Sequence, residues 1–146
     1  MHSIKQIPSR QTFEVRQPVL RPGKPVESCI FDGDDLSTTA HFGIYDNDTL
    51  VGVVSVFKSK SHLFDEENQF QLRGMAVLDS HQKQGIGEKL VHKAEEYISN
   101  NAGKLIWFNA REIAVGFYNR MGYNTTGDPF DIGDIGAHYV MFKNLS

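Results

Sequence analysis

The segment that most constrains this chain is a glycine-containing turn at residues 82–87, Gln-Lys-Gln-Gly-Ile-Gly. Residues 70–78 before it predict a strand, and the apolar face after it predicts a helix that starts near Ile86 and ends at Asn100 to Gly103. Gly85 and Gly87 let a ligand approach the backbone, and the first N–H groups of a helix have no partner within it. The turn is therefore suited to bind an anion, and a pyrophosphate fits it best.

Two common pyrophosphate motifs do not fit this turn. The dinucleotide fingerprint requires a third glycine where Leu90 stands, and the phosphate-binding loop of nucleotide hydrolases requires Gly-Lys-Ser/Thr where Gly87 is followed by Glu88. A nucleotide-binding regulatory domain is therefore disfavoured. The glycine pair alone is equally compatible with a tight turn that binds nothing.

The rest of the pattern predicts strands and helices that alternate in one domain spanning residues 1–146. Strands are expected at residues 4–7, 41–45, 50–57, 70–78, 105–108, 123–126 and 138–142, the last two joined by an acidic loop. Ser9 is expected to cap a helix that ends near Leu20. Gly74 inside a strand indicates a bulge. We predict an α/β fold, a mixed, mostly antiparallel sheet flanked by helices, with one parallel strand–helix–strand unit at residues 70–108.

A further helix is expected after residue 108. Asn109 would cap it and Gly122 would end it. Its apolar face would consist of Ile113, Ala114, Phe117 and Met121.

Composition excludes several classes of function. The net charge of −3 provides no basic surface, so nucleic-acid binding is not expected. The single cysteine, Cys29, excludes an internal disulfide and a thiolate metal cluster, and we expect a buried apolar role for it and no metal cofactor. The chain shows neither a signal-peptide pattern nor an apolar run of membrane-spanning length, so a soluble cytoplasmic protein without membrane partners is expected.

Two motifs resemble the GNAT superfamily of N-acetyltransferases. The stretch 72–77 (LRGMAV), followed by Gln82-x-x-Gly85-x-Gly87, is similar to the family's core acetyl-CoA motif. Residues 109–123 resemble its later helix, which ends in a Phe-Tyr-x-x-x-Gly-Phe/Tyr pattern, here Phe117 to Tyr123. The resemblance extends from about Thr49 to Tyr123. It implies a GNAT-like sheet whose parallel unit holds acetyl-CoA as cosubstrate.

The resemblance also implies roles for individual residues. Backbone groups of Met75, Ala76 and Val77 would pair with the pantetheine arm and polarise the thioester carbonyl. Asn109 would contact the same arm, and Tyr118 would protonate the departing CoA thiolate. A phenol with an ordinary pKa of about 10 can donate to a thiolate whose pKa is about 8.5. The pyrophosphate would be held by Gln82, Lys83, Gln84, Gly85, Ile86 and Gly87.

The acceptor side is less defined by the sequence. Many family members carry a glutamate where this chain has Gln71, which cannot take a proton. Arg73, on the same strand, could form a surface ion pair or anchor a substrate carboxylate. Ionisable groups that could act as the base are Glu66, Glu67, His62, His41 and His138. Acidic loops that could attract a cationic amine contain Asp32, Asp34, Asp35, Asp128, Asp131 and Asp134.

Two functions remain open at this point. The first is an enzyme that transfers an acetyl group from acetyl-CoA to a primary amine of a small molecule or peptide, by direct attack in a ternary complex. The alternative is a catalytically weak acyl-CoA sensor or regulatory module, which Gln71 keeps open. A homodimer is also compatible with the resemblance, because dimers are common in the family.

Overall fold

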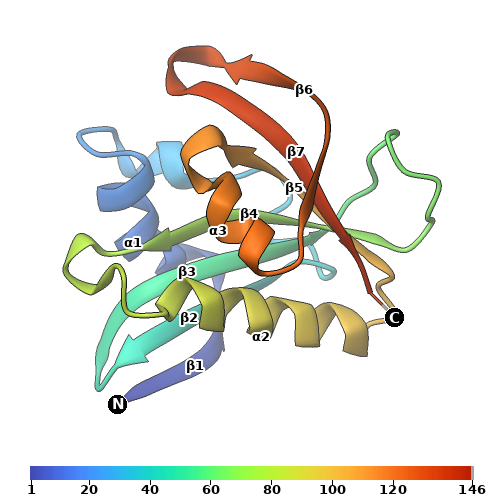
Figure 1. Ribbon diagram of the computed structural model, residues 1–146. Helices are drawn as coiled ribbons and strands as arrows, with labels where there is room; N and C mark the ends of the chain where they lie inside the picture. The colour runs from blue at the N-terminus through green and yellow to red at the C-terminus, as the bar shows by residue number, and fades with distance from the viewer. Residues whose placement is uncertain (146) are drawn as a thin grey trace.

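The computed structural model describes residues 1–145, apart from the side chain of Asp134. Within these residues, seven strands form one sheet in the order β1-β2-β3-β4-β5-β7-β6 (Figure 1). Only the β4–β5 pair is parallel, and the other pairs are antiparallel. The predicted fold class is therefore confirmed. The strands are β1 (His2–Ile7), β2 (Ala40–Asp46), β3 (Thr49–Lys58), β4 (Gln69–Val77), β5 (Leu105–Arg111), β6 (Asn124–Ile132) and β7 (Gly136–Asn144).

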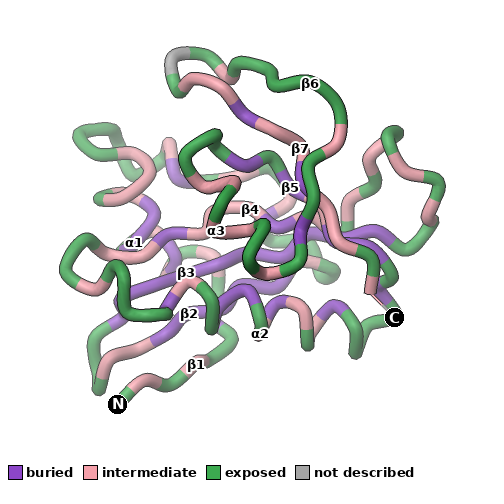
Figure 2. Tube along the Cα trace, in the orientation of Figure 1, coloured by how far each residue is buried: buried purple, intermediate pink, exposed green. Residues whose placement is uncertain are grey.

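Two long helices cover the sheet. Helix α1 (Ser9–Leu20) packs on β3 and β4, and α2 (Ile86–Asn100) packs on β2, β3 and β4. Their buried side chains belong to two separate apolar clusters, which shows that the helices cover opposite faces. Figure 2 shows the buried residues concentrated in the central strands and along one side of α2. The shorter helices are η1 (Val26–Cys29), η2 (Asp79–His81), η3 (Glu112–Ala114), α3 (Val115–Arg120) and η4 (Gly133–Ile135).

The β4 strand carries the bulge that Gly74 predicts. The register of β3 against β4 shifts between Val53 and Ser55, and Gly74 has φ of +64°. A Cβ at this position would lie 2.9 Å from the Phe31 ring and 3.2 Å from the Arg16 guanidinium. The site therefore requires glycine for both its backbone conformation and its space.

A buried polar network that the sequence did not indicate lies under this bulge. Arg16 is fully buried and donates to both carboxylate oxygens of Asp34, at 2.9 and 3.2 Å, and to the Ser55 hydroxyl at 2.9 Å. His41 Nε2 donates to the Asp34 carbonyl at 2.8 Å, so Nδ1 accepts from Ser55 at 2.6 Å. The network fixes α1 and the 30–39 loop against β2 and β3.

Some local predictions were wrong. Asn109 does not cap a helix, because β5 continues to Arg111 and stays paired with β7. A short 3₁₀ turn and the six-residue α3 follow instead, and Ile113, expected on a buried face, is 88% exposed. Ser9 is the first helical residue after Pro8 and donates to Asp35. Most of the expected acidic loop belongs to β6, which runs to Ile132.

Candidate active site

The β4 and β5 strands pair over three residues and then separate. The paired positions are Gln69, Phe70 and Gln71, which face Leu105, Ile106 and Trp107. Beyond Gln71, β4 remains paired with β3 and β5 remains paired with β7. Each strand therefore keeps an edge of backbone N–H and C=O groups that faces the opening between them. Such an edge can accept an extended ligand as an added strand does.

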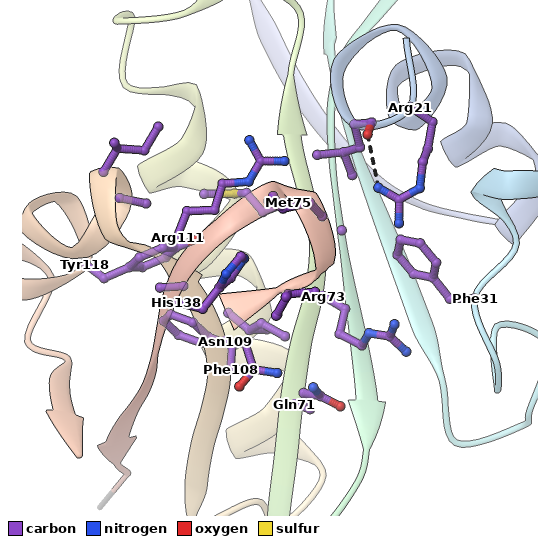
Figure 3. A pocket seen from close by; sticks show the side chains of 18 residues that line it. Arg21, Phe31, Gln71, Arg73, Met75, Phe108, Asn109, Arg111, Tyr118 and His138 are labelled. Carbon is purple, nitrogen blue, oxygen red and sulfur yellow. Dashed lines mark hydrogen bonds between the residues drawn. The ribbon is translucent and has the colours of Figure 1, made fainter. Parts of the chain in front are cut away.

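A cavity of about 370 Å³ occupies this opening. The structure brings Gln71, Arg73, Met75, Asn109 and Tyr118 together on its walls, all of which the sequence had suggested for the site (Figure 3). Ala76 is buried and Val77 is half-buried at the end of the same strand, so their side chains face the core rather than this cavity. Their backbone lies on the open edge of β4.

The glycine turn lies at the start of α2. Lys83 and Gly85 have φ of +64° and +78°, and no side chain caps the helix. The first N–H groups of α2 are therefore left for a ligand. A Cβ on Gly87 would lie 3.2 Å from Met75 and 3.4 Å from Phe117, which places this end of the turn beside the cavity wall.

The side chains of the turn have different roles. Gln82 donates to the Val77 carbonyl and to Asp79, both at 3.1 Å, so its amide stabilises the loop itself. Lys83 and Gln84 are exposed. The Ile86 side chain is buried in the core, and only its backbone can face a ligand.

Tyr118 is held by an aromatic cluster at the cavity wall. Its ring centroid lies 4.4 Å from Phe108, 5.0 Å from Phe117 and 6.0 Å from Tyr123. Burial raises the pKa of Tyr118 to about 12. The phenol is therefore protonated throughout the neutral pH range and can serve as a hydrogen-bond donor.

Among the candidate bases, only His138 lines the cavity. Its Nδ1 donates to the Gly136 carbonyl at 2.8 Å, because a carbonyl can only accept. The neutral ring then carries its lone pair on Nε2, for which no partner occurs among the described residues, and the ring lies at the cavity wall in Figure 3. Both nitrogens of the buried His41 are used by the Arg16 network. The other candidates, His62, Glu66 and Glu67, lie on the loop between β3 and β4, away from the cavity.

The acidic loops do not form the cavity wall. Asp34 is buried against Arg16, and Asp32, Asp35, Asp128 and Asp131 are exposed and lie outside the lining. The Asp134 side chain lies outside the described part of the structure. An acidic acceptor groove is therefore not present among the described residues.

Sequence reasoning missed several cavity residues. Leu20, Arg21 and Phe31 come from the chain segment around α1 and η1, where no motif was recognised. Arg111 and Ile113 belong to the segment that had been assigned to a helix. Arg111 follows the motif residue Asn109 by two positions, and this proximity was the sequence feature that could have indicated Arg111 as a site residue.

Comparisons with known proteins show to which family the chain belongs. The family model described as "Acetyltransferase (GNAT) domain" matches residues 31–138. The chain belongs to the GNAT family of acetyltransferases. An uncharacterized N-acetyltransferase of Bacillus subtilis, YitI, is 34% identical over 99% of this chain and 97% of its own length.

Solved structures show the same GNAT fold at low sequence identity. An aminoglycoside 6'-N-acetyltransferase complexed with coenzyme A has a TM-score of 0.76 and 16% identity, covering 97% of this chain and 96% of its own. The ribosomal-protein-S18-alanine N-acetyltransferase of Escherichia coli has a TM-score of 0.77 and 15% identity, covering 100% and 95%. No helix among residues 1–145 is long and apolar enough to cross a membrane.

Proposed function

We propose that this GNAT protein transfers an acetyl group from acetyl-CoA to a primary amine by direct attack within a ternary complex. The observation that carries the proposal is the opening between β4 and β5, which holds a cavity lined by Tyr118 and lies beside the α2 turn, where Gly87 faces Met75. This arrangement offers one binding path for pyrophosphate, pantetheine and thioester, and leaves the rest of the cavity for the acceptor.

The donor half follows from the backbone. The pyrophosphate would bind at the N-terminus of α2, near Gly85, where free N–H groups and the helix dipole favour an anion. The pantetheine arm would lie along Met75, Ala76 and Val77, with Asn109 facing it from β5. An N–H of β4 directed at the thioester oxygen would stabilise the oxyanion of the tetrahedral intermediate.

The chemical step makes one bond and breaks one. The neutral amine nitrogen attacks the thioester carbon, the C–N bond forms, and collapse of the intermediate breaks the C–S bond. The surplus proton on nitrogen passes to a base, and the CoA thiolate receives a hydrogen bond from Tyr118. Because the pKa of Tyr118 is about 12, the phenol is a weaker acid than a thiol with a pKa of about 8.5. We therefore assign it stabilisation of the thiolate by hydrogen bonding, with the final proton coming from solvent.

The function is tested by incubating the protein with acetyl-CoA and a panel of primary amines while free CoA thiol is measured. Amine-dependent thiol release, with intersecting initial-rate lines when both substrates are varied, is expected. Tight binding of acetyl-CoA without turnover on any amine would instead favour the acyl-CoA sensor, which Gln71 at the cavity wall keeps as the alternative.

His138 is proposed as the base that accepts the amine proton. His138→Gln is expected to lower kcat/KM for the amine by roughly 10²-fold. The matched control is His62→Gln, an exposed change on the β3–β4 loop, which should leave kcat/KM unchanged. An unchanged kcat/KM in His138→Gln would show that the amine loses its proton to water.

Gly85 provides a test of the cofactor turn. Alanine at Gly85 meets no atom within 4 Å, so its folding cost arises from φ of +78° alone, about 1–2 kcal/mol. If pyrophosphate approaches this backbone, Gly85→Ala should also raise the Kd for acetyl-CoA at least about tenfold. Gly127 is a matched control, with φ of +74° and equally open surroundings. Gly127→Ala should lower the stability by a similar amount and leave the Kd for acetyl-CoA, measured by calorimetry, unchanged. Equal Kd values for the two variants would contradict pyrophosphate binding at Gly85.

A further inference from the structure

Three arginines from distant parts of the chain line the acceptor cavity. Arg21 follows α1, Arg73 lies on β4 next to the Gly74 bulge, and Arg111 ends β5. In Figure 3, Arg111 and His138 lie on one side of the cavity and Arg73, Phe31 and Arg21 on the other, with Met75 between them. Arg73 and Arg111 reach the cavity from the two strands that diverge there, and Arg21 reaches it from the end of α1.

These arginines have no carboxylate partner within the described residues. Arg21 donates to the adjacent Leu20 carbonyl at 3.0 Å, and none of the three forms a salt bridge among residues 1–145. The described lining contains neither aspartate nor glutamate. Of the nearby carboxylates, Asp34 is already bound by Arg16 and Asp32 is exposed.

Arg73 is the most constrained of the three. Its guanidinium lies 4.7 Å from the Phe31 ring centroid and 5.4 Å from that of Phe57. Burial, followed by the positive charge of Arg16, lowers the pKa of Arg73. A positive charge that is partly removed from water without a carboxylate in ion-pair contact is costly, and a bound anion would offset that cost.

We propose that the acceptor is an amine that also carries an anionic group, a carboxylate or a phosphate, recognised by Arg73 together with Arg21 and Arg111. This inference rests on the acetyl transfer proposed above and adds the class of substrate. The apolar part of the cavity mouth, formed by Phe31, Ile113 and Ile135, favours an acceptor with an apolar body, such as an amino acid with an aliphatic side chain. A bidentate guanidinium contact would hold the anionic group while the amine faces Met75 and Tyr118.

The substrate class is tested with pairs of amines that differ in the anionic group. The pairs are L-leucine with L-leucinamide, and phosphoethanolamine with ethanolamine, and spermidine represents polycations. The anionic member of a pair should have kcat/KM at least tenfold above the neutral one. This is a stringent comparison, because the amine of L-leucinamide is less basic and is therefore neutral more often near pH 7. A higher kcat/KM for L-leucine than for L-leucinamide indicates that the site recognises a carboxylate. A higher kcat/KM for phosphoethanolamine than for ethanolamine indicates that it recognises a phosphate.

Arginine variants separate this proposal from the proposed function. Arg73→Gln and Arg21→Gln should each lower kcat/KM for the preferred anionic amine by about 10- to 100-fold and leave the neutral partner nearly unaffected. Arg10→Gln, an exposed change on α1, is the control and should alter neither.

Several outcomes would overturn the anionic acceptor. Higher kcat/KM for spermidine than for every anionic amine would do so while acetyl transfer itself stands. An increase in KM for acetyl-CoA, with no change toward the amine, would assign the arginines to the cofactor instead. If no amine is acetylated, the proposed function fails. Calorimetric titration of the CoA-bound protein with L-leucine and phosphoethanolamine then tests whether the arginines still form an anion site. Binding that Arg73→Gln abolishes supports the anion site, and the absence of binding refutes it.

Discussion

Replacing Tyr118 by phenylalanine is expected to lower kcat for amine acetylation by about 10²-fold while the Kd for acetyl-CoA stays within about twofold. The change removes only the hydroxyl and keeps the ring that packs on Phe108 and Phe117. The leaving thiolate then has no phenol donor. Steady-state rates and calorimetric titration with acetyl-CoA measure the two effects separately.

A matched variant and a pH series make this prediction specific. Tyr97→Phe removes a hydroxyl from α2, outside the acceptor cavity, and should leave kcat unchanged. Because the pKa of Tyr118 is about 12, its ionisation cannot produce an alkaline loss of activity below about pH 11. Folding stability should decline above about pH 10, because the folded protein holds this proton more tightly than the unfolded chain does. Tyr118→Phe should reduce that decline and leave the part that comes from Tyr123, whose pKa is also raised by burial. Unchanged kcat in Tyr118→Phe would remove the hydroxyl from the mechanism.

Replacing Arg16 by methionine is expected to destabilise the protein by about 3–5 kcal/mol. Methionine retains much of the apolar stem but leaves the Asp34 carboxylate buried without its cation, since side-chain exposure at the pair is 0% and 3%. Chemical denaturation measures the free energy of unfolding directly. In thermal unfolding the change corresponds to a decrease in Tm on the order of 10 °C.

Two further variants test the reason for this loss. Lys60→Met breaks an ion pair of similar length that is largely exposed, and should cost less than about 1 kcal/mol. The double variant Arg16→Met with Asp34→Leu should recover part of the lost stability, because it leaves no unpaired charge. A loss in Arg16→Met no larger than that in Lys60→Met would contradict the account. The Arg16 network also contacts the cavity wall, since the Arg16 guanidinium lies 3.9 Å from the centroid of the Phe31 ring.

The donor side of the site could be predicted from local sequence. The helix after the turn begins at Ile86 and ends at Asn100, as its period indicated, and Gly74 marks the bulge of β4. Glycine conformations and helical periodicity are properties of short segments, and a single sequence displays them. The roles of Gly85 and Tyr118 in binding acetyl-CoA stay predictions.

The acceptor side could not be predicted in the same way. Arg21, Phe31 and Arg111 lie far apart in the sequence and line one cavity only in the folded chain, so no local pattern encodes their proximity. The Arg16–Asp34 pair joins a helix to a loop 18 positions later, and a lone arginine in a helix normally indicates a solvated face. Asn109 was assigned as a helix cap because its residue type suits one, but pairing with β7 extended the strand through it.

The account is tested most directly by a crystal structure of the protein with CoA. We expect the pyrophosphate at the N-terminus of α2, the pantetheine arm between β4 and β5 along Met75 to Val77, and the sulfur within hydrogen-bond distance of the Tyr118 hydroxyl. The cavity with Arg73 and His138 would then lie beyond the sulfur. A pantetheine arm bound outside this opening, or a sulfur that faces away from Tyr118, would contradict the account.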